Sequence, residues 1–226
     1  MKVSVVIPCM ITNDKIFAIA AKCIKLARQK TTVPFELIIV ETVSNYFSTY
    51  SDVYIQEKNK TTVTKSINKG LKIATGDYTV LLTNDVFVED GWLEALLDCF
   101  TKYKDCGAAT LASTQFFHLK LNLIEEWGIW GSLFMMPTKL LKELDYLDER
   151  YQGSWDDTDL WMRLALKGYK IYRNHNVVVE HLIRQTHGSD PIHMSNYYEN
   201  EKLFKDKFKN HRLDTIYKVL VEGVVI

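Results

Sequence analysis

Two short apolar runs near the start of the chain, VSVVIP at residues 3–8 and FELIIVE at residues 35–41, decide the fold class. Continuous apolar runs of this length are typical of strands that are buried on both faces of a parallel sheet. Between the two runs, Ile16, Cys23 and Ala27 follow the spacing of one helical face. The order strand, helix, strand therefore predicts a βαβ unit.

The same alternation continues to about residue 113. Residues 53–56 predict a short strand, residues 63–74 a helix and residues 78–82 a third strong strand. Asp90 is expected to cap the helix that follows. Because alternating strands and helices are typical of parallel sheets, we expect an α/β fold with a mostly parallel central sheet and helices on both faces.

The second half of the chain is richer in aromatic residues and less regular. Pro137 predicts the start of a short helix, and Ser154 predicts the start of a longer one. Residues 170–174 and 176–180 predict two short strands joined by a polar turn. A charged, aromatic helix is expected at about residues 190–210, and no linker or repeat suggests a second independent domain.

The composition is that of an ordinary globular domain. The chain has 226 residues and a formal net charge of zero, which excludes a strongly basic nucleic-acid-binding surface. A local anion site remains possible where a metal ion supplies the positive charge. The four cysteines lack zinc-site spacing, so we expect buried free thiols in a reducing compartment. No segment has the length of a membrane span or the form of a signal peptide, so we expect a cytoplasmic protein.

Thr83, Asn84 and Asp85 directly follow the third strong strand. Ligands of open α/β sheets bind beyond the carboxyl ends of the strands. A carboxylate at such a place can bind a hard divalent cation, which in turn contacts phosphate oxygens. The same three residues would also suit a simple turn, since Asn and Asp are common there.

Three carboxylates lie close together at Asp156, Asp157 and Asp159. Neighbouring like charges raise one another's pKa, which suits a general base that faces a cleft. Acidic residues are also favoured at the start of a helix, and Asp159 has the spacing for an ion pair with Arg163. The pattern alone leaves the catalytic and the structural interpretation open.

Two further polar residues stand at the ends of predicted strands. His181 could be a metal ligand, and Glu41 could accept a hydrogen bond from a nucleobase or a ribose hydroxyl. Each could equally be a structural residue at a strand end. No GxGxxG follows the first strand and no GxxxxGK[ST] is present, which excludes the dinucleotide fingerprint and the P-loop.

Five segments in their order along the chain resemble the family 2 glycosyltransferases of GT-A fold, over roughly residues 1–185. The segments are VSVVIP, LIIVE, TKSINKGLKIATGDYTVLLTNDV, LDERYQGSWDDTDLWMRLALKGYKI and VVVEH. The resemblance implies a single Rossmann-like glycosyltransferase domain over residues 1–226. Within it we expect a nucleotide-sugar-binding half at residues 1–113, an acceptor-side and catalytic half at residues 114–190, and a helical tail at residues 191–226.

The resemblance implies inverting transfer of a sugar from a nucleotide diphosphate sugar, with UDP as the expected nucleotide, to a hydroxyl of a glycan or another acceptor. It places these residues at the nucleotide sugar: Pro8, Glu41, Thr62, Thr64, Asn68, Thr83, Asn84 and Asp85. Asp85 matches the last position of the family's DXD motif, and it would bind Mn²⁺ or Mg²⁺ together with His181. Thr83 and Asn84 depart from that motif and leave one carboxylate there.

The resemblance assigns the catalytic base to Asp157, the second member of an acidic pair with Asp156. An inverting transfer needs such a base to deprotonate the acceptor hydroxyl, and it needs positive charge at the departing diphosphate. The aromatic segment at residues 127–131 is expected on the acceptor side. Trp130 offers a face to sugar C–H groups and Gly131 lets the backbone come close, although the tryptophans would fit a core equally well.

Two other functions fit parts of this pattern. A nucleotidyltransferase would need a Gly-rich loop with Lys or Arg after the first strand, and PCMITNDKI at residues 8–16 has no glycine and no arginine. A non-catalytic nucleotide- or sugar-binding module of the same fold would not need both Asp85 and Asp157. We therefore expect a glycosyltransferase of polysaccharide biosynthesis, with a nucleotide-sugar donor, a hydroxyl acceptor and no nucleic-acid partner.

Overall fold

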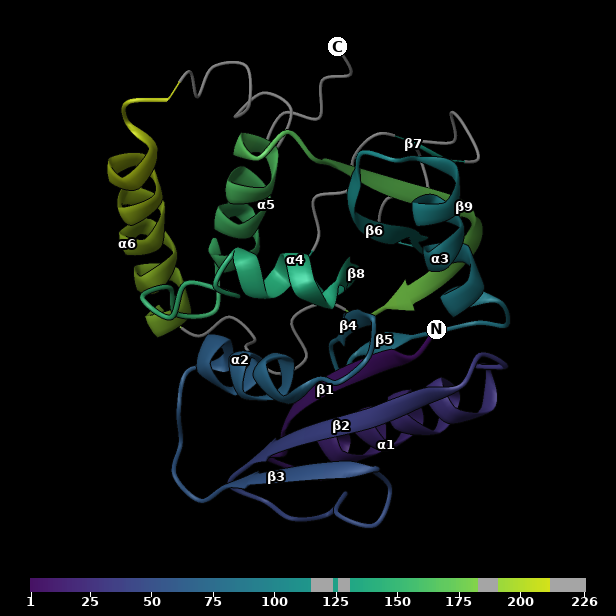
Figure 1. Cartoon of the computed structure of the whole chain (residues 1–226). Helices are drawn as coiled ribbons and strands as arrows, with labels where there is room; N and C mark the ends of the chain where they lie inside the picture. The colour runs from purple at the N-terminus through teal and green to yellow at the C-terminus, as the bar shows by residue number, and fades with distance from the viewer. Residues whose placement is uncertain (115–123, 126–130, 183–190, 212–226) are drawn as a thin grey trace.

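The computed structural model describes residues 1–114, 124–125, 131–182 and 191–211 (Figure 1). The elements of the first half are β1 (Val3–Met10), α1 (Asp14–Gln29), β2 (Phe35–Thr42), β3 (Val53–Glu57), α2 (Val63–Ile73), β4 (Tyr78–Leu82), β5 (Val86–Phe87), α3 (Trp92–Lys102) and β6 (Cys106–Ser113). The elements of the second half are β7 (Ile124–Glu125), β8 (Leu133–Pro137), α4 (Thr138–Glu143), α5 (Asp156–Leu166), β9 (Lys170–His181) and α6 (Pro191–Phe208).

The sheet confirms the predicted α/β fold. Its strand order is β3-β2-β1-β4-β8-β6-β9-β5, and β7 pairs with β9. The strands β3, β2, β1 and β4 are mutually parallel, as the alternating pattern predicted. Beyond β4 the sheet is mixed, because β8 runs antiparallel to both of its neighbours while β6 and β9 run parallel to each other.

The reversed direction of β8 brings distant residues to one edge of the sheet. Leu133, at the start of β8, faces Leu82, at the end of β4. The Thr83 amide donates to the Ser132 carbonyl at 2.8 Å. The residues that lead into β8 therefore lie beside the residues that follow β4.

The central strands pack against helices on both faces. In β1, Val5 belongs to one buried cluster and Val6 to the other, because successive side chains point to opposite faces. The first cluster contains residues of α1 and α3, and the second contains residues of α2, α4, α5 and α6. Burial on both faces explains why the strands appear in the sequence as continuous apolar runs.

The single strand β9 replaces the two short strands that the sequence predicted around a turn. Its pairing with β6 shifts in register: Leu111 faces Asn174, whereas the next residue, Ala112, faces Val178. The intervening residues 175–177 are accommodated as a bulge, so the polar segment bends the strand without ending it.

Two predicted helix caps are wrong. Asp90 does not cap α3; Gly91 does, in a left-handed conformation with φ of 77°, and the Asp90 carboxylate pairs with Lys30 at 2.7 Å. Ser154 does not cap α5 either, because Trp155 occupies the N-cap position with φ of 66°. In both places tertiary contacts override the local preference for an Asp or Ser cap.

Other boundaries follow the sequence closely. Asn13 caps α1 by accepting from the Ile16 amide at 3.0 Å. Pro137 ends β8 and directly precedes α4, and Gly168 follows α5 with φ of 84°. At these three boundaries an Asn N-cap, a proline and a glycine stand where helix ends favour them.

The four cysteines are free and buried, as predicted: Cys9, Cys23, Cys99 and Cys106. Burial is the largest influence on each thiol, and it raises the pKa of all four. In the part of the chain that the structure describes, no helix has the length and apolar character needed to cross a lipid bilayer.

Candidate active site

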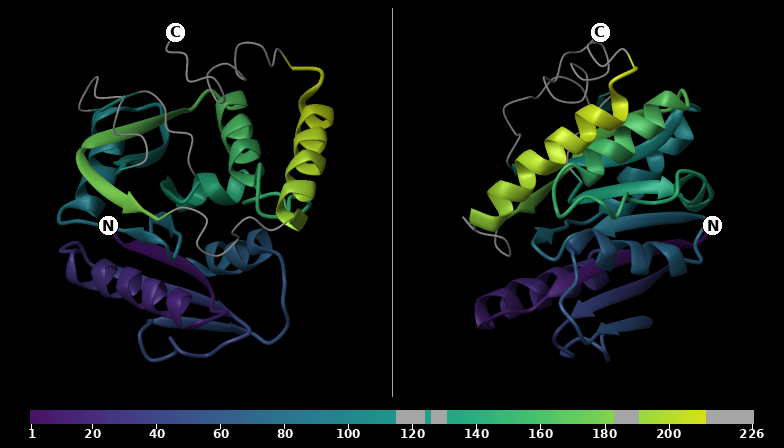
Figure 2. Two further views of the ribbon diagram at one scale, coloured as in Figure 1. Left: turned by 180° about the vertical axis from the view of Figure 1, so that it is seen from behind. Right: turned by 90° about the vertical axis from the view of Figure 1, so that its left-hand side faces the viewer.

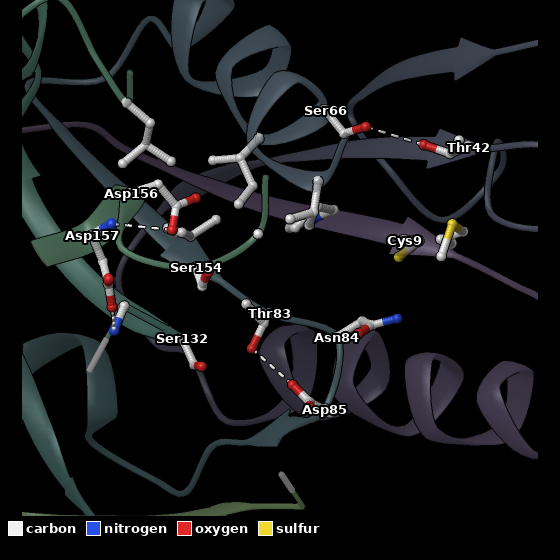
Figure 3. Close-up of a pocket in the computed structure, with 18 of the residues that line it drawn as sticks. Cys9, Thr42, Ser66, Thr83, Asn84, Asp85, Ser132, Ser154, Asp156 and Asp157 are labelled. Atoms are coloured by element: carbon white, nitrogen blue, oxygen red, sulfur yellow. Dashed lines mark hydrogen bonds between the residues drawn. The ribbon is translucent and has the colours of Figure 1, made fainter. Parts of the chain in front are cut away.

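A cavity of about 320 Å³ opens where β1 and β4 end and where α5 begins (Figure 3). Eight of the predicted site residues line it: Pro8, Thr83, Asn84, Asp85, Gly131, Asp156, Asp157 and His181. They come from sequence segments far apart, and the reversed strand β8 is what brings Gly131 among them. Trp130, predicted on the acceptor side, lies outside the described residues.

Four predicted residues do not line this cavity: Glu41, Thr62, Thr64 and Asn68. The Thr62 hydroxyl caps α2. The Asn68 amide donates to the Leu147 carbonyl at 2.8 Å, and its oxygen accepts from the Leu147 amide at 3.1 Å. These contacts support elements behind the cavity, and a role of these residues in nucleotide binding stays a prediction.

Glu41 is the last residue but one of β2, close to the expected strand end, but its carboxylate is occupied by the loop that follows. One oxygen accepts from the Ser44 hydroxyl at 2.6 Å and the Tyr46 amide at 2.8 Å. The other accepts from the Phe47 amide at 2.9 Å and the Tyr54 hydroxyl at 3.0 Å. The side chain is fully buried, so in this conformation it shapes the loop, and recognition of a nucleobase stays a prediction.

At one end of the cavity, Asp85 lies between a hydroxyl and an imidazole. The Thr83 hydroxyl donates to Oδ1 of Asp85 at 2.8 Å, and Nε2 of His181 lies 3.6 Å from Oδ2. Antiparallel pairing of β5 with β9 places His181 opposite Val86, next to Asp85. Burial raises the pKa of Asp85, but the interactions with His181 and Thr83 outweigh it and hold the pKa below its usual range.

This end of the cavity fits a divalent cation that is shared with a ligand. The described residues contain no group of three or more His, Cys, Asp or Glu side chains that could hold a metal ion alone. Asp85 and His181 supply one carboxylate oxygen and one imidazole nitrogen. Mg²⁺ commonly takes one or two protein carboxylates and completes its shell with phosphate oxygens and water. The donor set therefore matches a cation that a diphosphate helps to bind.

At the other end, two adjacent carboxylates begin α5. Oδ2 of Asp157 accepts from the Gly131 amide at 3.0 Å, and Oδ1 accepts from the Thr158 amide at 2.7 Å. Oδ2 of Asp156 accepts from the Thr64 hydroxyl at 2.8 Å, and Oδ1 accepts from the Asp157 amide at 3.1 Å. Both carboxylates are thus held in fixed directions, and both line the cavity.

The electrostatics of this end are opposite to those around Asp85. Burial, followed by the negative charge of Asp156, raises the pKa of Asp157 to about 6. Burial also raises the pKa of Asp156. Asp159 is fully buried and pairs with Arg163 at 2.7 Å, as the spacing predicted, and also with Lys207 of α6. Asp159 is therefore engaged away from the cavity, which leaves the other two carboxylates as candidates for a base.

Gly131, two residues before β8, allows the backbone to approach the Asp157 carboxylate closely. A Cβ atom at this position would lie 2.5 Å from Cβ of Asp157 and 2.6 Å from its Oδ2. No residue with a side chain can occupy this place without moving Asp157. The glycine predicted on the acceptor side is thus in direct contact with the predicted base.

Several lining residues were not predicted from the sequence. They are Cys9, Met10, Thr42, Thr61, Val63, Ser66, Ile67, Leu81, Ser132, Phe134, Leu147, Gly153 and Ser154. Cys9 and Met10 follow Pro8 on β1, and Ser132 follows Gly131. These three could have been predicted, because each lies next to or near a predicted site residue in the sequence. The sequence predicts Ser154 as a helix cap. No local signal distinguishes a serine that caps a helix from a serine that lines a cavity.

Comparison with known proteins gives a family and a fold. The family model described as "Glycosyl transferase family 2" matches residues 4–152. A search of curated proteins finds no match. The structure of GalNAc-T7 with UDP, GalNAc and Mn²⁺ superposes with a TM-score of 0.73 at 13% identity, covering 91% of this chain and 47% of that one.

Two further solved structures agree. The mannosyltransferase PcManGT from Pyrobaculum calidifontis, in complex with GDP-Man and Mn²⁺, gives a TM-score of 0.66 at 15% identity, covering 82% of this chain and 58% of that one. TarS of S. aureus gives 0.70 at 16% identity, covering 96% and 41%. At such identities these likenesses show the fold alone, and this chain spans about half the length of these proteins.

Proposed function

The chain belongs to glycosyl transferase family 2, and we propose that it moves a sugar from a nucleotide diphosphate sugar to a hydroxyl group of an acceptor. The observation that carries this proposal is the division of the cavity. One end holds Asp85, whose pKa is lowered, and the other end holds Asp157, whose pKa is raised. Glycosyl transfer needs one group for the leaving diphosphate and another for the acceptor proton.

We assign the diphosphate to the end with Asp85. Asp85 and His181 would hold Mn²⁺ or Mg²⁺, which when bound neutralises the charge of the departing diphosphate. The Thr83 hydroxyl keeps the Asp85 carboxylate directed by its hydrogen bond. Pro8 and Asn84 line the cavity beside it and would contact the nucleotide sugar.

We assign the acceptor proton to Asp157. Its pKa of about 6 lets it be ionised at neutral pH and still accept a proton from a hydroxyl as the glycosidic bond forms. The Gly131 amide directs Oδ2 of the carboxylate, and burial together with the negative charge of Asp156 keeps the pKa high. One base on the side opposite the leaving group gives transfer with inversion, through an oxocarbenium-like transition state and without an enzyme nucleophile.

The nucleotide is best sought among uridine and guanosine diphosphate sugars. GalNAc-T7 was solved with UDP, S. aureus TarS with UDP and with UDP-GlcNAc, and PcManGT with GDP-Man. UDP is therefore the first nucleotide to test. A glycan hydroxyl is the acceptor class that suits this family, in the assembly of a polysaccharide.

A ligand screen followed by a turnover assay tests the proposal. Thermal denaturation is recorded with UDP-sugars and GDP-sugars in the presence of Mn²⁺, where a ligand at 100 times its Kd adds about 2.7 kcal/mol of stability. The best donor is then incubated with and without glycan acceptors, and release of nucleotide diphosphate is measured. We expect acceptor-dependent release. Stabilisation by a donor with no release under any condition would instead identify a non-catalytic binding module.

A further inference from the structure

The C-terminal helix α6 contacts the turn that leads into α5. The two helices lie side by side in Figures 1 and 2. The Asn200 side-chain amide donates to the Ser154 carbonyl at 3.0 Å and to the Ser154 hydroxyl at 2.9 Å. Asn200 is 4% exposed, so both bonds are shielded from water. One side chain of α6 therefore fixes both the backbone and the side chain of a cavity-lining residue.

The turn that Asn200 contacts has an unusual backbone. Gly153 and Trp155 both adopt left-handed conformations, with φ of 80° and 66°. Glycine does so freely, but a bulky residue such as tryptophan rarely does, and it stays there only where its surroundings enforce it. The Trp155 ring is 7% exposed and packs against Phe204 and Tyr197 of α6, with centroid distances of 5.1 and 5.7 Å. The helix α6 therefore supplies part of the surroundings that enforce this turn.

The turn determines where the first residues of α5 point. Asp156 and Asp157 follow Trp155 directly, and both line the cavity together with Ser154. One turn further along α5, the Lys207 ammonium of α6 contacts the buried Asp159 carboxylate at 2.5 Å. Contacts with α6 thus precede and follow the two cavity carboxylates in the sequence.

We propose that Asn200 is a positioning residue, which holds Ser154 so that the left-handed turn directs Asp156 and Asp157 into the cavity. This role rests on the proposed function for its kinetic consequence. Its structural consequence, order in the first turn of α5, can be measured without any activity.

The test compares Asn200→Ala with Asn174→Ala. Asn174 is also a fully buried asparagine whose amide donates to a backbone carbonyl, that of Ala95 at 2.8 Å, but it lies on β9 and does not line the cavity. The two variants remove the same group from equally buried places. We expect both to lower Tm. Only Asn200→Ala should lower kcat, by about 10- to 100-fold, because a small misplacement of a catalytic group costs that much.

Three readouts separate positioning from general destabilisation. In Asn200→Ala the donor Kd should stay unchanged while kcat falls, and the acidic limb of the pH profile should move to lower pH as Asp157 becomes better solvated. Hydrogen exchange at the Asp157 and Thr158 amides, both bonded to aspartate oxygens, should become about tenfold faster than in Asn174→Ala. Asn200→Asp, which keeps the shape and loses the donor, should behave like Asn200→Ala.

Each outcome decides the matter. Equal kcat in Asn200→Ala and Asn174→Ala, or unchanged exchange at the start of α5 in both Asn200 variants, overturns the positioning role. If the unaltered protein transfers no sugar to any acceptor, the proposed function fails. The exchange comparison then still tests whether Asn200 orders the turn.

Discussion

The two ends of the cavity contain carboxylates of the same chemical type in opposite electrostatic states. Asp85 is 8% exposed, and Asp157 is half-buried, so both are largely withdrawn from water. Burial raises the pKa of each. Asp85 nevertheless has a lowered pKa because His181 and Thr83 stabilise its charge, whereas at Asp157 burial and the negative charge of Asp156 act in the same direction and raise the pKa. The neighbours therefore oppose the effect of burial at one end of the cavity and reinforce it at the other.

The difference assigns a chemical task to each end. A carboxylate that stays ionised at all relevant pH values is suited to a cation and a diphosphate. A carboxylate with a raised pKa is suited to taking up a proton near neutral pH. Pairs of groups whose environments push their pKa values apart are the best structural indication of such a division of labour.

The largest effect should follow from replacing the base. Asp157→Asn is nearly isosteric, so the fold and the nucleotide affinity should persist. Turnover should fall by about 10² to 10⁴, the usual contribution of a general base. Steady-state kinetics and nucleotide titration measure the two quantities separately. If Asp157→Asn keeps most of its activity while Asp156→Asn loses it, the base is Asp156.

A smaller effect, at the opposite end, should appear in binding. Asp85→Asn removes the carboxylate whose Oδ2 lies 3.6 Å from His181, and we expect nucleotide diphosphate affinity in Mn²⁺ to fall by about 10- to 100-fold or more. Calorimetric titration with and without Mn²⁺ measures the loss. His181→Ala should weaken binding less. Unchanged affinity in Asp85→Asn would contradict the assignment of the cation to this end of the cavity.

The pH profile sharpens the comparison further. If Asp157 must be ionised, kcat/KM should fall about tenfold for each pH unit below about pH 6. Asp156→Asn removes the negative neighbour, so the pKa of Asp157 should fall and the acidic limb should move to lower pH. Rates measured from about pH 4.5 to 8, with saturating donor and varied acceptor concentration, give kcat/KM for the acceptor and locate the acidic limb. If the acidic limb does not move in Asp156→Asn, the charge of Asp156 does not contribute to the raised pKa of Asp157.

The smallest effect concerns stability. A carboxyl group whose pKa is raised in the folded state lowers stability progressively as the pH rises above its unfolded-state pKa, and the loss is complete above its folded-state pKa. Asp157→Asn should therefore raise Tm at pH 8 by a few degrees, corresponding to about 1 kcal/mol, with no gain near pH 4. Asp85→Asn should lower Tm, because it removes the negative charge that His181 and the Thr83 hydroxyl stabilise. Thermal denaturation of both variants at the two pH values checks the opposite signs.

The sequence alone predicts correctly the elements whose signals are local. The apolar runs predicted β1, β2 and β4, and the carboxyl ends of those strands gave the positions of Asp85 and Glu41. The adjacent carboxylates of α5 identified the opposite end of the cavity. The strands are confirmed, because the alternation of strands and helices indicates which strand ends share an edge. The functional roles of the carboxylates at those ends stay predictions.

The features that were missed depend on contacts between distant segments. Nothing in the residues of β8 shows that it runs antiparallel to β4. Serine is a better helix cap than tryptophan, yet packing against α6 places Trp155 at the start of α5. The carboxylate of Glu41 is occupied by the loop after β2, and no spacing pattern encodes those four hydrogen bonds. Tertiary structure overrides local preference in each case.

The buried cysteines can serve as probes of local opening of the fold. A thiol reagent reacts with the thiolate, and all four thiols are buried with raised pKa values, so the folded chain should react slowly. In excess reagent, the labelling rate then reports how often each region is exposed to solvent. All four cysteines belong to the same buried cluster, but of the four Cys9 alone also lines the cavity. Slower alkylation of Cys9 alone would signal a filled cavity, and slower alkylation of all four would signal a more stable fold, without any substitution in the chain.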